Sequence, residues 1–375
     1  MATPKLRFPA FEEKWNKQRL DSFLERVSNP IDVIPNKKYS QIGIRSHGKG
    51  IFHKEAVTGE ELGNKRVFWV EPNALVVNIV FAWERAIAVT SDAEKGMIAS
   101  HRFPMYLPKN NLSNVNFLRY LFVTDKGQSY LELASPGGAG RNKTLGQSNF
   151  SELKIDLPSL EEQTKIATFL STVDEKISQL SQKLHLLGQY KQGMMQKLFS
   201  QQIRFKADDG SEFGDWEILK FKDVITIKYG KDHKKLKDGD IPVLGTGGIM
   251  RYVDSYLYDG ESILIGRKGT IDKPQFISGK FWTVDTLFYT EIGEKIRPKF
   301  AFQQLLLVNW LNLNEATGVP SLNTTSIGNI ELKVPSLEEQ TKIANFLSAI
   351  DQKIDVVSEQ LEQAKLWKKG LLQQM

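Results

Sequence analysis

Two stretches of the chain place apolar residues at alternating spacings of three and four positions. The first stretch runs from position 166 to 198 and the second from 343 to 375. A spacing that averages about 3.5 residues over roughly four or more heptads is typical of a coiled-coil seam. We therefore predict two long helices that pair within one chain. The residues expected to make this helix pairing are Ile166, Leu170, Val173, Ile177, Leu180 and Leu184, with Ile343, Leu347, Ile350, Ile354, Val357 and Leu361.

An alternative interpretation is that each helix packs only on its own domain. That arrangement would leave an isolated heptad seam in water, whereas two stripes of equal length and register can cover each other. Lys191 and Lys368 interrupt the seam at matching positions. These lysines could fix the register or lie near a partner, or their stems could lie along apolar surface.

The same decapeptide, PSLEEQTKIA, opens both stretches, at positions 158 and 335. The offset of 177 residues is far longer than the roughly 20–50-residue period of a solenoid, so a domain-sized unit is duplicated. Ser159 with Glu162, and Ser336 with Glu339, have the spacing of a capping box. In that motif the serine accepts from the third amide and the glutamate reaches back. Each decapeptide is therefore expected to start a helix directly after its proline.

The two segments that precede these helices in the chain are predicted to be rich in β-sheet. The first contains the strand-like runs VFWV, ALVVNIVFAW, AIAVT and ELKIDL, and the second contains VITIKYG, SILIG and FWTVDTLFY. One helical stretch comes late in each, near SNVNFLRYLFVTDKGQSYLELA and near PKFAFQQLLLVNWL. We predict an α+β fold with an internal pseudo-two-fold repeat: a sheet-rich domain over 1–157, a helix over 158–200, a second sheet-rich domain over 201–334 and a second helix over 335–375.

Both sheet-rich segments carry Lys and Arg among Gly, Ser, Thr and His in stretches without periodicity. Such loops suit duplex DNA, because glycine lets backbone amides approach phosphates while arginine and lysine can reach guanine edges. A single lysine of this kind is usually only solvated, but clusters in both halves favour nucleic acid. We expect arginines on bases and lysines on phosphates. The candidate DNA-binding residues are Lys37, Lys38, Arg45, Ser46, His47, Lys49, Arg102, Arg141 and Lys143, with Lys231, His233, Lys234, Lys235, Thr246, Arg251, Arg267 and Lys268.

Composition narrows the function further. The 375 residues include no cysteine, and the five histidines show no paired ligand spacing, so we expect neither disulfides nor a metal site. The apolar runs are too short to span a bilayer, and the first residues lack the apolar core of a signal peptide, so a cytoplasmic protein is expected. A net charge of +6 and a pI of about 9.1 are compatible with an anionic partner.

A chemical site is hard to find in the sequence. The stretch GGAGRNKT has Asn142 where a phosphate-binding loop needs its second glycine. An N-P-P-Y tetrad and a glycine-rich cofactor turn after a first strand are both missing. Scattered acids such as Asp285 fit a surface or turn role better than a catalytic one. We therefore expect a chain that binds without catalysing and holds no cofactor. A nucleotide-dependent enzyme that uses Lys143 is a lesser alternative, which a lack of ATP binding would exclude.

Taken over its whole length, the chain resembles the specificity subunit of type I restriction-modification systems. The motifs that carry the resemblance are LRFPAF with Trp15, NIVFAWERAIAV, SHRFP, GTGG, IGRKGTI and FWTVDTLFY. Its most specific part is the repeated PSLEEQTKIA followed by a long helix that ends in GMMQKL or GLLQQM. The resemblance implies two target-recognition domains, each reading one half of a bipartite double-stranded DNA site, separated by an antiparallel pair of conserved helices.

The resemblance also implies partners. Two modification subunits, which are adenine methyltransferases, would dock on the conserved helices, and restriction/translocase subunits would join them. S-adenosylmethionine, ATP and Mg would belong to those partners. Because the two sheet-rich segments match poorly in sequence, the two half-sites should differ. A competing hypothesis from another class is a coiled-coil scaffold, without a role on DNA, whose two end domains bind protein or carbohydrate.

Overall fold

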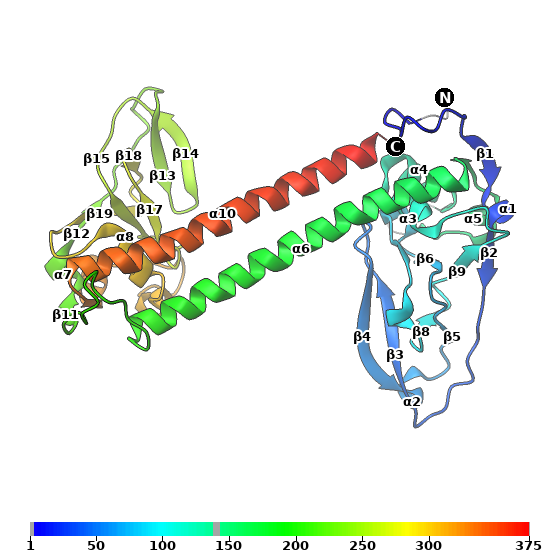
Figure 1. Cartoon of the computed structure of the whole chain (residues 1–375), viewed down its shortest axis with the longest axis horizontal. Coiled ribbons are helices and arrows are strands. Elements are labelled where there is room, and N and C mark those ends of the chain that lie inside the picture. Colours follow the sequence, from blue (N-terminus) through cyan, green and yellow to red (C-terminus); the bar gives the residue numbers. More distant parts are fainter. Residues whose placement is uncertain (1–3, 138–142, 375) are drawn as a thin grey trace. The chain divides into compact units, whose positions relative to one another are not determined.

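The same strand order occurs twice along the chain. The structure, a computed structural model, describes residues 4–137 and 143–374, and it divides into two units (Figure 1). Unit 1 comprises residues 1–181 and 360–375, and unit 2 comprises residues 182–359. Each unit therefore contains one sheet-rich segment together with part of each long helix.

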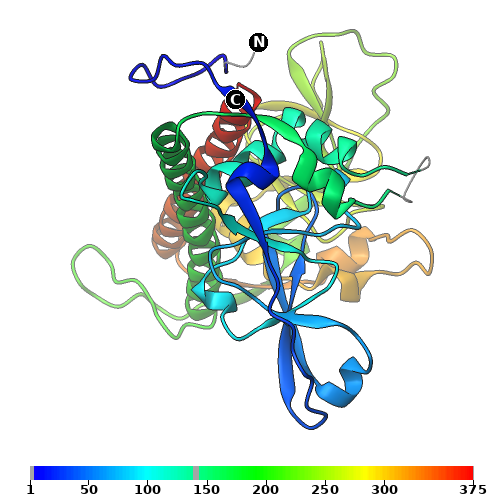
Figure 2. The same cartoon turned by 90° about the vertical axis from the view of Figure 1, so that its right-hand side faces the viewer.

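Unit 1 has two four-stranded sheets and a separate two-stranded ribbon. The first sheet has the order β2 (Leu24–Val27), β9 (Met105–Pro108), β6 (Leu75–Val77), β7 (Ile87–Val89). The second has the order β4 (Ile51–Thr58), β3 (Lys38–Ile44), β8 (Ile98–Ser100), β5 (Val67–Trp69). The ribbon joins β1 (Asn16–Arg19) to β10 (Lys154–Leu157). Strands β3 and β8 are parallel, and the other pairs are antiparallel. Figure 2 shows this unit from the side.

Unit 2 repeats this topology strand for strand. Its first sheet has the order β12 (Ile225–Tyr229), β19 (Leu287–Ile292), β16 (Ser262–Gly266), β17 (Gln275–Ile277). Its second has the order β14 (Gly248–Val253), β13 (Ile241–Gly245), β18 (Lys280–Thr283), β15 (Tyr258–Asp259). The ribbon joins β11 (Glu217–Lys220) to β20 (Glu331–Val334). Here β13 and β18 form the parallel pair, so the duplication extends to the segments whose sequences differ.

Short helices complete each unit. In unit 1 they are α1 (Leu20–Phe23), α2 (Gly59–Leu62), α3 (Val115–Val123), α4 (Asp125–Leu133) and α5 (Gln147–Glu152). In unit 2 they are α7 (Phe221–Val224), α8 (Pro298–Leu305) and α9 (Thr324–Gly328). Three-residue or four-residue 3-10 helices lie at Ala82–Glu84, Asp92–Glu94 and Trp310–Leu313.

The single helical stretch predicted late in the first segment is in fact two helices. The chain is extended at Thr124, between α3 and α4, and the Thr124 hydroxyl accepts from the Gly127 amide at 3.0 Å to cap α4. A Cβ on Gly127 would lie 2.0 Å from the Leu121 carbonyl oxygen, so only glycine allows this close approach. The sequence signal for the break is the polar run TDKGQS at 124–129, which the prediction of one continuous helix passed over.

The two long helices, α6 (Leu160–Phe199) and α10 (Leu337–Gln373), pair in antiparallel fashion (Figure 1). In unit 1 the end of α10 lies on the first half of α6, where the rings of Phe169 and Trp367 meet edge to face at 5.8 Å. In unit 2 the end of α6 lies on the first half of α10, where Leu198 and Leu347 belong to one buried cluster. The prediction of intrachain pairing is confirmed.

Most of the residues predicted for the seam are buried. Nine of the twelve predicted residues are buried, and Ile177, Leu184 and Ile354 are half-buried. Each buried side chain of this size stabilises the fold by about 1.5–3 kcal/mol. The two interrupting lysines form ion pairs across the seam: Lys191 lies 2.6 Å from Asp351, and Lys368 pairs with Asp174. Among the described residues, no helix is long and apolar enough to cross a membrane.

The repeated decapeptide fastens each long helix to its own sheet-rich segment. The Ser159 hydroxyl accepts from the Glu162 amide at 3.3 Å, as predicted for a cap. The glutamate half of the predicted capping box is wrong, because both carboxylate oxygens of buried Glu162 instead accept from Arg7 at 2.7 Å. The bidentate arginine fixes the chain before the first strand to the helix start.

The second decapeptide uses the same contacts. The Ser336 hydroxyl accepts from the Glu339 amide at 3.3 Å, and the Glu339 carboxylate accepts from Arg204 at 2.7 and 3.0 Å. Trp216 adds a third donor at 3.0 Å. A carboxylate that is fully buried is tolerated only when it is paired in this way.

Two glutamines follow these glutamates and bind backbone groups inside each unit. The Gln163 side chain donates to the carbonyls of Pro158 and Leu112 and accepts from the Asn114 amide at 2.8 Å. Gln340 makes the matching set, accepting from the Arg297 amide at 2.7 Å. The identical letters EQ at 162–163 and 339–340 therefore reflect buried polar contacts, and the two glutamines position α3 and α8.

Candidate nucleic-acid interface

A cavity of about 680 Å³ opens in unit 1 where β3, β6 and β8 end. Two predicted residues, Ser46 and Arg102, line it. Lys54, Lys65 and His101 line it as well, and none of these three had been predicted. All the ionisable groups in the lining are cationic or imidazole, so the cavity suits a ligand rich in hydrogen-bond acceptors.

The turn from β3 to β4 carries four predicted residues side by side: Arg45, Ser46, His47 and Lys49. It is fixed to the loop after β6. The His47 amide donates to the Glu84 carbonyl at 2.7 Å, and the Ser46 hydroxyl donates to the Glu84 carboxylate at 2.7 Å. His47 has a φ of 61°, which is uncommon for a residue with a side chain and shows a turn held by its surroundings.

The cationic side chains of this turn are exposed. Arg45, His47 and Lys49 all lie at the surface. The Arg45 guanidinium lies 4.8 Å from the centre of the Phe52 ring, which orients it without neutralising its charge. The turn therefore presents donors on a fixed backbone.

Arg102 lies on the neighbouring loop between β8 and β9. Its carbonyl accepts from the Ile79 amide at 3.0 Å, and the Ile79 carbonyl accepts from the Leu145 amide at 2.8 Å. These bonds bring the segment that contains half-buried Lys143 beside the same loop. Arg141 lies outside the described residues.

Lys37 and Lys38 are not brought together with the turn. They lie at the opposite end of β3, a seven-residue strand that spans roughly 20 Å at about 3.3 Å per residue. The Lys37 ammonium lies over the rings of Tyr39 and Trp69, at 5.6 and 5.5 Å from their centres. The structure thus gives these lysines a place apart from the cavity.

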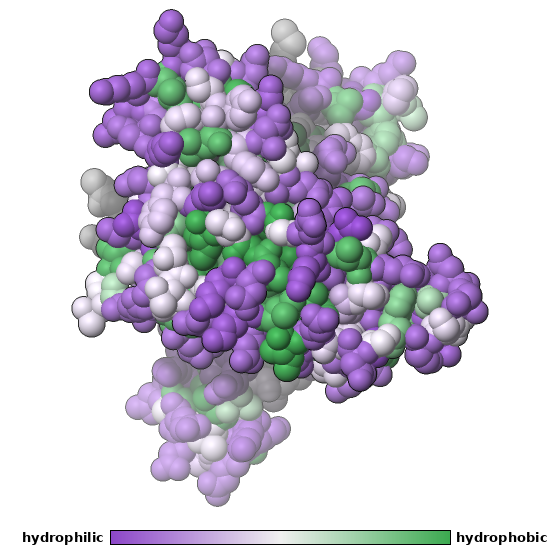
Figure 3. All heavy atoms as spheres, turned by 90° about the vertical axis from the view of Figure 1, so that its left-hand side faces the viewer, coloured by the Kyte–Doolittle hydropathy of each residue, from purple (hydrophilic) through white to green (hydrophobic). Residues whose placement is uncertain are grey.

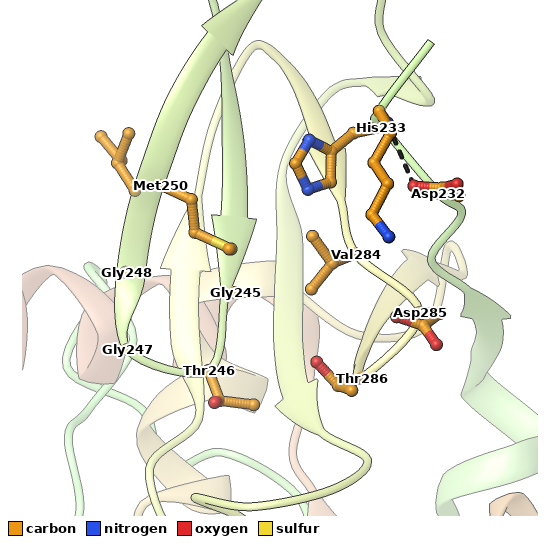
Figure 4. A pocket seen from close by; sticks show the side chains of 12 residues that line it. Asp232, His233, Gly245, Thr246, Gly247, Gly248, Met250, Val284, Asp285 and Thr286 are labelled. Atoms are coloured by element: carbon orange, nitrogen blue, oxygen red, sulfur yellow. Dashed lines mark hydrogen bonds between the residues drawn. The ribbon is translucent and has the colours of Figure 1, made fainter. Parts of the chain in front are cut away.

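Unit 2 has a corresponding cavity of about 720 Å³ at the ends of β13 and β18 (Figure 4). The predicted residues His233, Lys234 and Thr246 line it. Asp232 and Asp285 line it too, and Figure 4 shows their carboxylates on the side away from Met250. This cavity therefore offers acidic as well as basic groups.

Hydrogen bonds fix the loop before β13. The Lys231 amide donates to the Thr283 carbonyl at 2.8 Å, and the Trp282 indole donates to the Lys231 carbonyl at 2.9 Å. The Lys234 amide donates to the Asp232 carboxylate at 3.0 Å, and this backbone hydrogen bond lowers the pKa of Asp232. The Nδ1 atom of His233 is buried without a partner in the described structure. Lys235 is exposed next to this loop.

Arg267 supports the cavity from the loop after β16. Its guanidinium donates to the Asp285 carbonyl at 3.2 Å and lies 5.4 Å from the centre of the Tyr229 ring. Its amide and that of exposed Lys268 both donate to the Thr286 carbonyl, at 2.9 and 3.2 Å. The loop between β18 and β19 is therefore held by the loop that carries two predicted residues.

Arg251 is already occupied within the chain. Its guanidinium donates to Asp238 at 2.6 Å and to the Leu236 carbonyl at 3.3 Å. A base contact by Arg251 would require breaking this ion pair. Among the described residues, no group of three or more His, Cys, Asp or Glu side chains could hold a metal ion.

Sequence reasoning missed five ionisable residues in the two cavities, because the signal for them is topological. They lie on strands or loops that only the order of the strands in the sheets brings together. The missed residues are Lys54, Lys65, His101, Asp232 and Asp285.

The face of the molecule in Figure 3 is mostly hydrophilic, with apolar side chains gathered near its centre.

The fold and the paired cavities define a class of protein built from two repeats of one sheet topology and an antiparallel pair of long helices. Comparison with known proteins gives the family. The family model described as "Type I restriction modification DNA specificity domain" matches residues 72–187 and 214–366. These matches fall on both sheet-rich segments and on both long helices.

Individual relatives agree. The chain is 30% identical to the type I restriction enzyme MjaVIII specificity subunit of Methanocaldococcus jannaschii, over 98% of this chain and 92% of that protein. The S subunit of a type I restriction-modification system from M. genitalium has a similar structure, with a TM-score of 0.68 and 18% identity, over 99% of this chain and 98% of that one. A structure described as showing complex assembly and conformational transition of the type I R-M system matches with a TM-score of 0.55 and 16% identity, over 96% of both chains.

The chain belongs to the family of type I restriction-modification DNA specificity domains. It is a specificity subunit, which is the non-catalytic, DNA-recognising component of such a system. The resemblance stated from the sequence is confirmed.

Proposed function

We propose that the chain recognises a bipartite double-stranded DNA target, with one half read by each unit and the gap set by the pair of long helices. The two corresponding cavities support this proposal most directly. Both lie at the ends of the parallel pair, β3 with β8 and β13 with β18, and both carry residues predicted for DNA contact. A duplicated reading surface with different side chains fits a target whose halves differ.

The charge of the loops supports a division of roles. Exposed Lys49, Lys234 and Lys268 suit phosphates, because an ammonium is a compact charge without a preferred plane. Arg102 and Arg267 suit guanine, whose O6 and N7 atoms match a planar guanidinium. Under this proposal the chain functions in the cytoplasm, in contact with DNA, and contributes no catalytic group.

We further propose that two modification subunits dock on a duplicated aromatic surface, and that restriction/translocase subunits join them. In unit 1 the rings of Phe8 and Phe169 meet at 5.8 Å and, with half-exposed Trp367, line an apolar cavity of about 320 Å³. Exposed aromatic side chains of this kind are enriched where proteins meet. S-adenosylmethionine, ATP and Mg would be bound by these partners.

Unit 2 supports the same proposal with equivalent residues. Phe205 and Phe346 meet at 5.7 Å, as Phe8 and Phe169 do. Half-exposed Tyr190 occupies the repeat position of Trp367. Two copies of one surface on one chain suit two copies of one partner.

Selection of bound duplexes from a randomised pool tests the DNA proposal. The chain should enrich two short, dissimilar half-sites at a fixed spacing. Arg102→Ala should relax one half-site and Arg267→Ala the other, each by about 1–3 kcal/mol. Lys49→Ala should weaken all sequences alike and reduce the salt dependence of binding. Binding that does not weaken with salt, or that enriches no sequence, would favour the protein-scaffold hypothesis.

Stoichiometry tests the docking proposal. Purified methyltransferase subunit of the same system should bind the wild-type chain in a 2:1 ratio, measured by light scattering. Trp367→Ala or Tyr190→Ala should each reduce the ratio toward 1:1. Lys365→Ala serves as the control and should retain the full ratio, because Lys365 is an exposed residue of α10 that does not line the apolar cavity. Full stoichiometry in both aromatic variants would contradict the proposed surface.

A further inference from the structure

Arg102 and Asp285 occupy the same place in the two units. Each is the second residue after the parallel strand that runs beside the hairpin, β8 in unit 1 and β18 in unit 2. Each lies on the loop that leads to the next strand of the other sheet, and each lines the cavity of its unit. The duplicated topology therefore presents a guanidinium in one unit and a carboxylate in the other.

The Asp285 carboxylate has no role inside the protein. Its side chain is exposed, and within the described part of the chain its carboxylate makes no ion pair or hydrogen bond (Figure 4). Its backbone is nevertheless fixed, since its carbonyl accepts from Arg267 and the neighbouring Val284 amide donates to the Leu244 carbonyl at 3.0 Å. The side chain is thus held at the cavity on an ordered loop without being used there.

A second acid in the same cavity has a different environment. The Asp232 carboxylate accepts from the Lys234 amide, so it has a structural partner within its own loop. Asp285 has none, and a free carboxylate on a DNA-facing surface opposes binding through repulsion of phosphates. A compensating contact with a hydrogen-bond donor on the DNA would explain its position.

The chemistry of the base edges limits which group of the DNA can be that donor. In the major groove only the amino groups of cytosine and adenine donate. Adenine presents its amino group beside the N7 acceptor, an arrangement that matches an amide better than a carboxylate. Cytosine presents its N4 amino group without a neighbouring acceptor, which suits a carboxylate.

Resting on the DNA recognition proposed above, we propose that Asp285 is a specificity-determining residue of unit 2. Its carboxylate accepts a hydrogen bond from the N4 amino group of one cytosine in the half-site that this unit reads. Arg102, at the corresponding place in unit 1, donates to a guanine in the other half-site. The same loop position thus selects a cytosine in one half-site and a guanine in the other.

The test uses the full-length chain and the duplex that it enriches from a randomised pool. Each cytosine of that duplex is replaced in turn by 2-pyrimidinone, which lacks the N4 amino group, and affinities are measured at fixed salt. One replacement should weaken wild-type binding by about fivefold to a hundredfold. Asp285→Ala should bind the two duplexes equally. Asp272→Ala, an exposed acid outside the cavity lining, is the charge-matched control and should retain the wild-type preference.

A second variant separates a lost contact from a damaged fold. Asp285→Asn places a donor beside an acceptor and should move the preference at that position from cytosine to adenine, a gain that misfolding cannot produce. An Asp285→Ala chain that still distinguishes the analogue, or that binds every duplex more tightly by one common factor, overturns this inference alone. A wild-type chain that enriches no sequence overturns the proposed function and the inference together.

Discussion

The ammonium group of Lys191 lies 2.6 Å from a carboxylate oxygen of Asp351, so that α6 and α10 are joined by an ion pair in unit 2. Their repeat counterparts, Lys368 and Asp174, are joined in unit 1 with the helices exchanged, the lysine now on α10. The interruption of the apolar seam is therefore reciprocal. Each long helix contributes one lysine and one aspartate to the pairing of the two.

Removing the Lys191 to Asp351 pair should destabilise the fold measurably. The Lys191 side chain is only 14% exposed and that of Asp351 34%, so the pair is intermediate between a surface and a buried ion pair. Lys191→Met with Asp351→Asn in a double-mutant cycle should give a coupling energy of about 1–2 kcal/mol from urea unfolding. The exposed pair of Lys365 with Glu362 on α10 should give less than about 0.5 kcal/mol. Equal coupling in the two cycles would contradict the proposed contribution of the seam pair.

The buried glutamate at a helix start should be far more sensitive than its neighbour. Glu162→Gln leaves the Arg7 guanidinium without its paired charge and should lower the free energy of unfolding by about 3 kcal/mol. Glu161→Gln, at the adjacent exposed position, should change it by less than about 0.5 kcal/mol. Chemical denaturation of both variants checks the difference. Similar losses would mean that the Arg7 contact contributes little.

The acid stability of the chain should depend on Asp174. Burial opposes its ionisation, but hydrogen bonds from Lys368 and Tyr120 and the nearby positive charges outweigh burial, so its pKa lies below the ordinary value of 3.8. A carboxyl with a lowered folded-state pKa stabilises the fold above its unfolded pKa, and this contribution is lost as pH falls through the folded pKa. Asp174→Asn should thus be less stable than wild type at neutral pH, with a shallower fall below about pH 4.

Unfolding free energies measured for both chains between neutral pH and pH 2 test this expectation. Parallel curves that differ only by a constant offset would show that Asp174 titrates alike in the folded and unfolded chains. Such a result would remove the electrostatic basis of the prediction.

Two glycines should respond to alanine with opposite signs. Gly48 has a φ of +64°, and a Cβ there would lie 2.6 Å from the Val123 side chain, so Gly48→Ala should destabilise by about 1–2 kcal/mol. It should also disturb the turn that carries His47 and Lys49, and so weaken DNA binding. Gly188→Ala, in α6 with no atom within 4 Å of its Cβ, should stabilise by about 0.5–1 kcal/mol. Thermal unfolding and filter binding measure the two effects, and stabilisation at Gly48 would contradict the described turn.

The sequence predicted the long helices well because their physics is local. A heptad stripe and a repeated decapeptide specify where α6 and α10 begin and what covers them, and Ser159 and Ser336 act as predicted. The partners of Glu162 and Glu339 could not be predicted in the same way. Arg7 and Arg204 lie more than a hundred residues from those glutamates, and sequence spacing carries no information about such contacts.

The sheets and the two cavities were less predictable for a different reason. Many different sequences can form the same strand order, because a strand requires only suitable apolar positions. The two segments therefore have the same topology although their sequences differ. The cavities combine loops from several strands, and only the topology shows that Ser46 and Arg102 share one cavity while Lys37 lies apart. Asp285 looked unremarkable in sequence because its counterpart, Arg102, is recognisable only by its place after a strand.

Asp174 serves two elements of unit 1 with one charge. Its Oδ2 atom accepts from the Tyr120 hydroxyl of α3 at 2.7 Å, while its Oδ1 atom pairs with Lys368 of α10. The positions of α3 and of the α10 end are consequently thermodynamically linked. A ligand that displaces α3 must alter how tightly the end of α10 is held, and a protein bound at that end must alter the affinity for the ligand by the same factor.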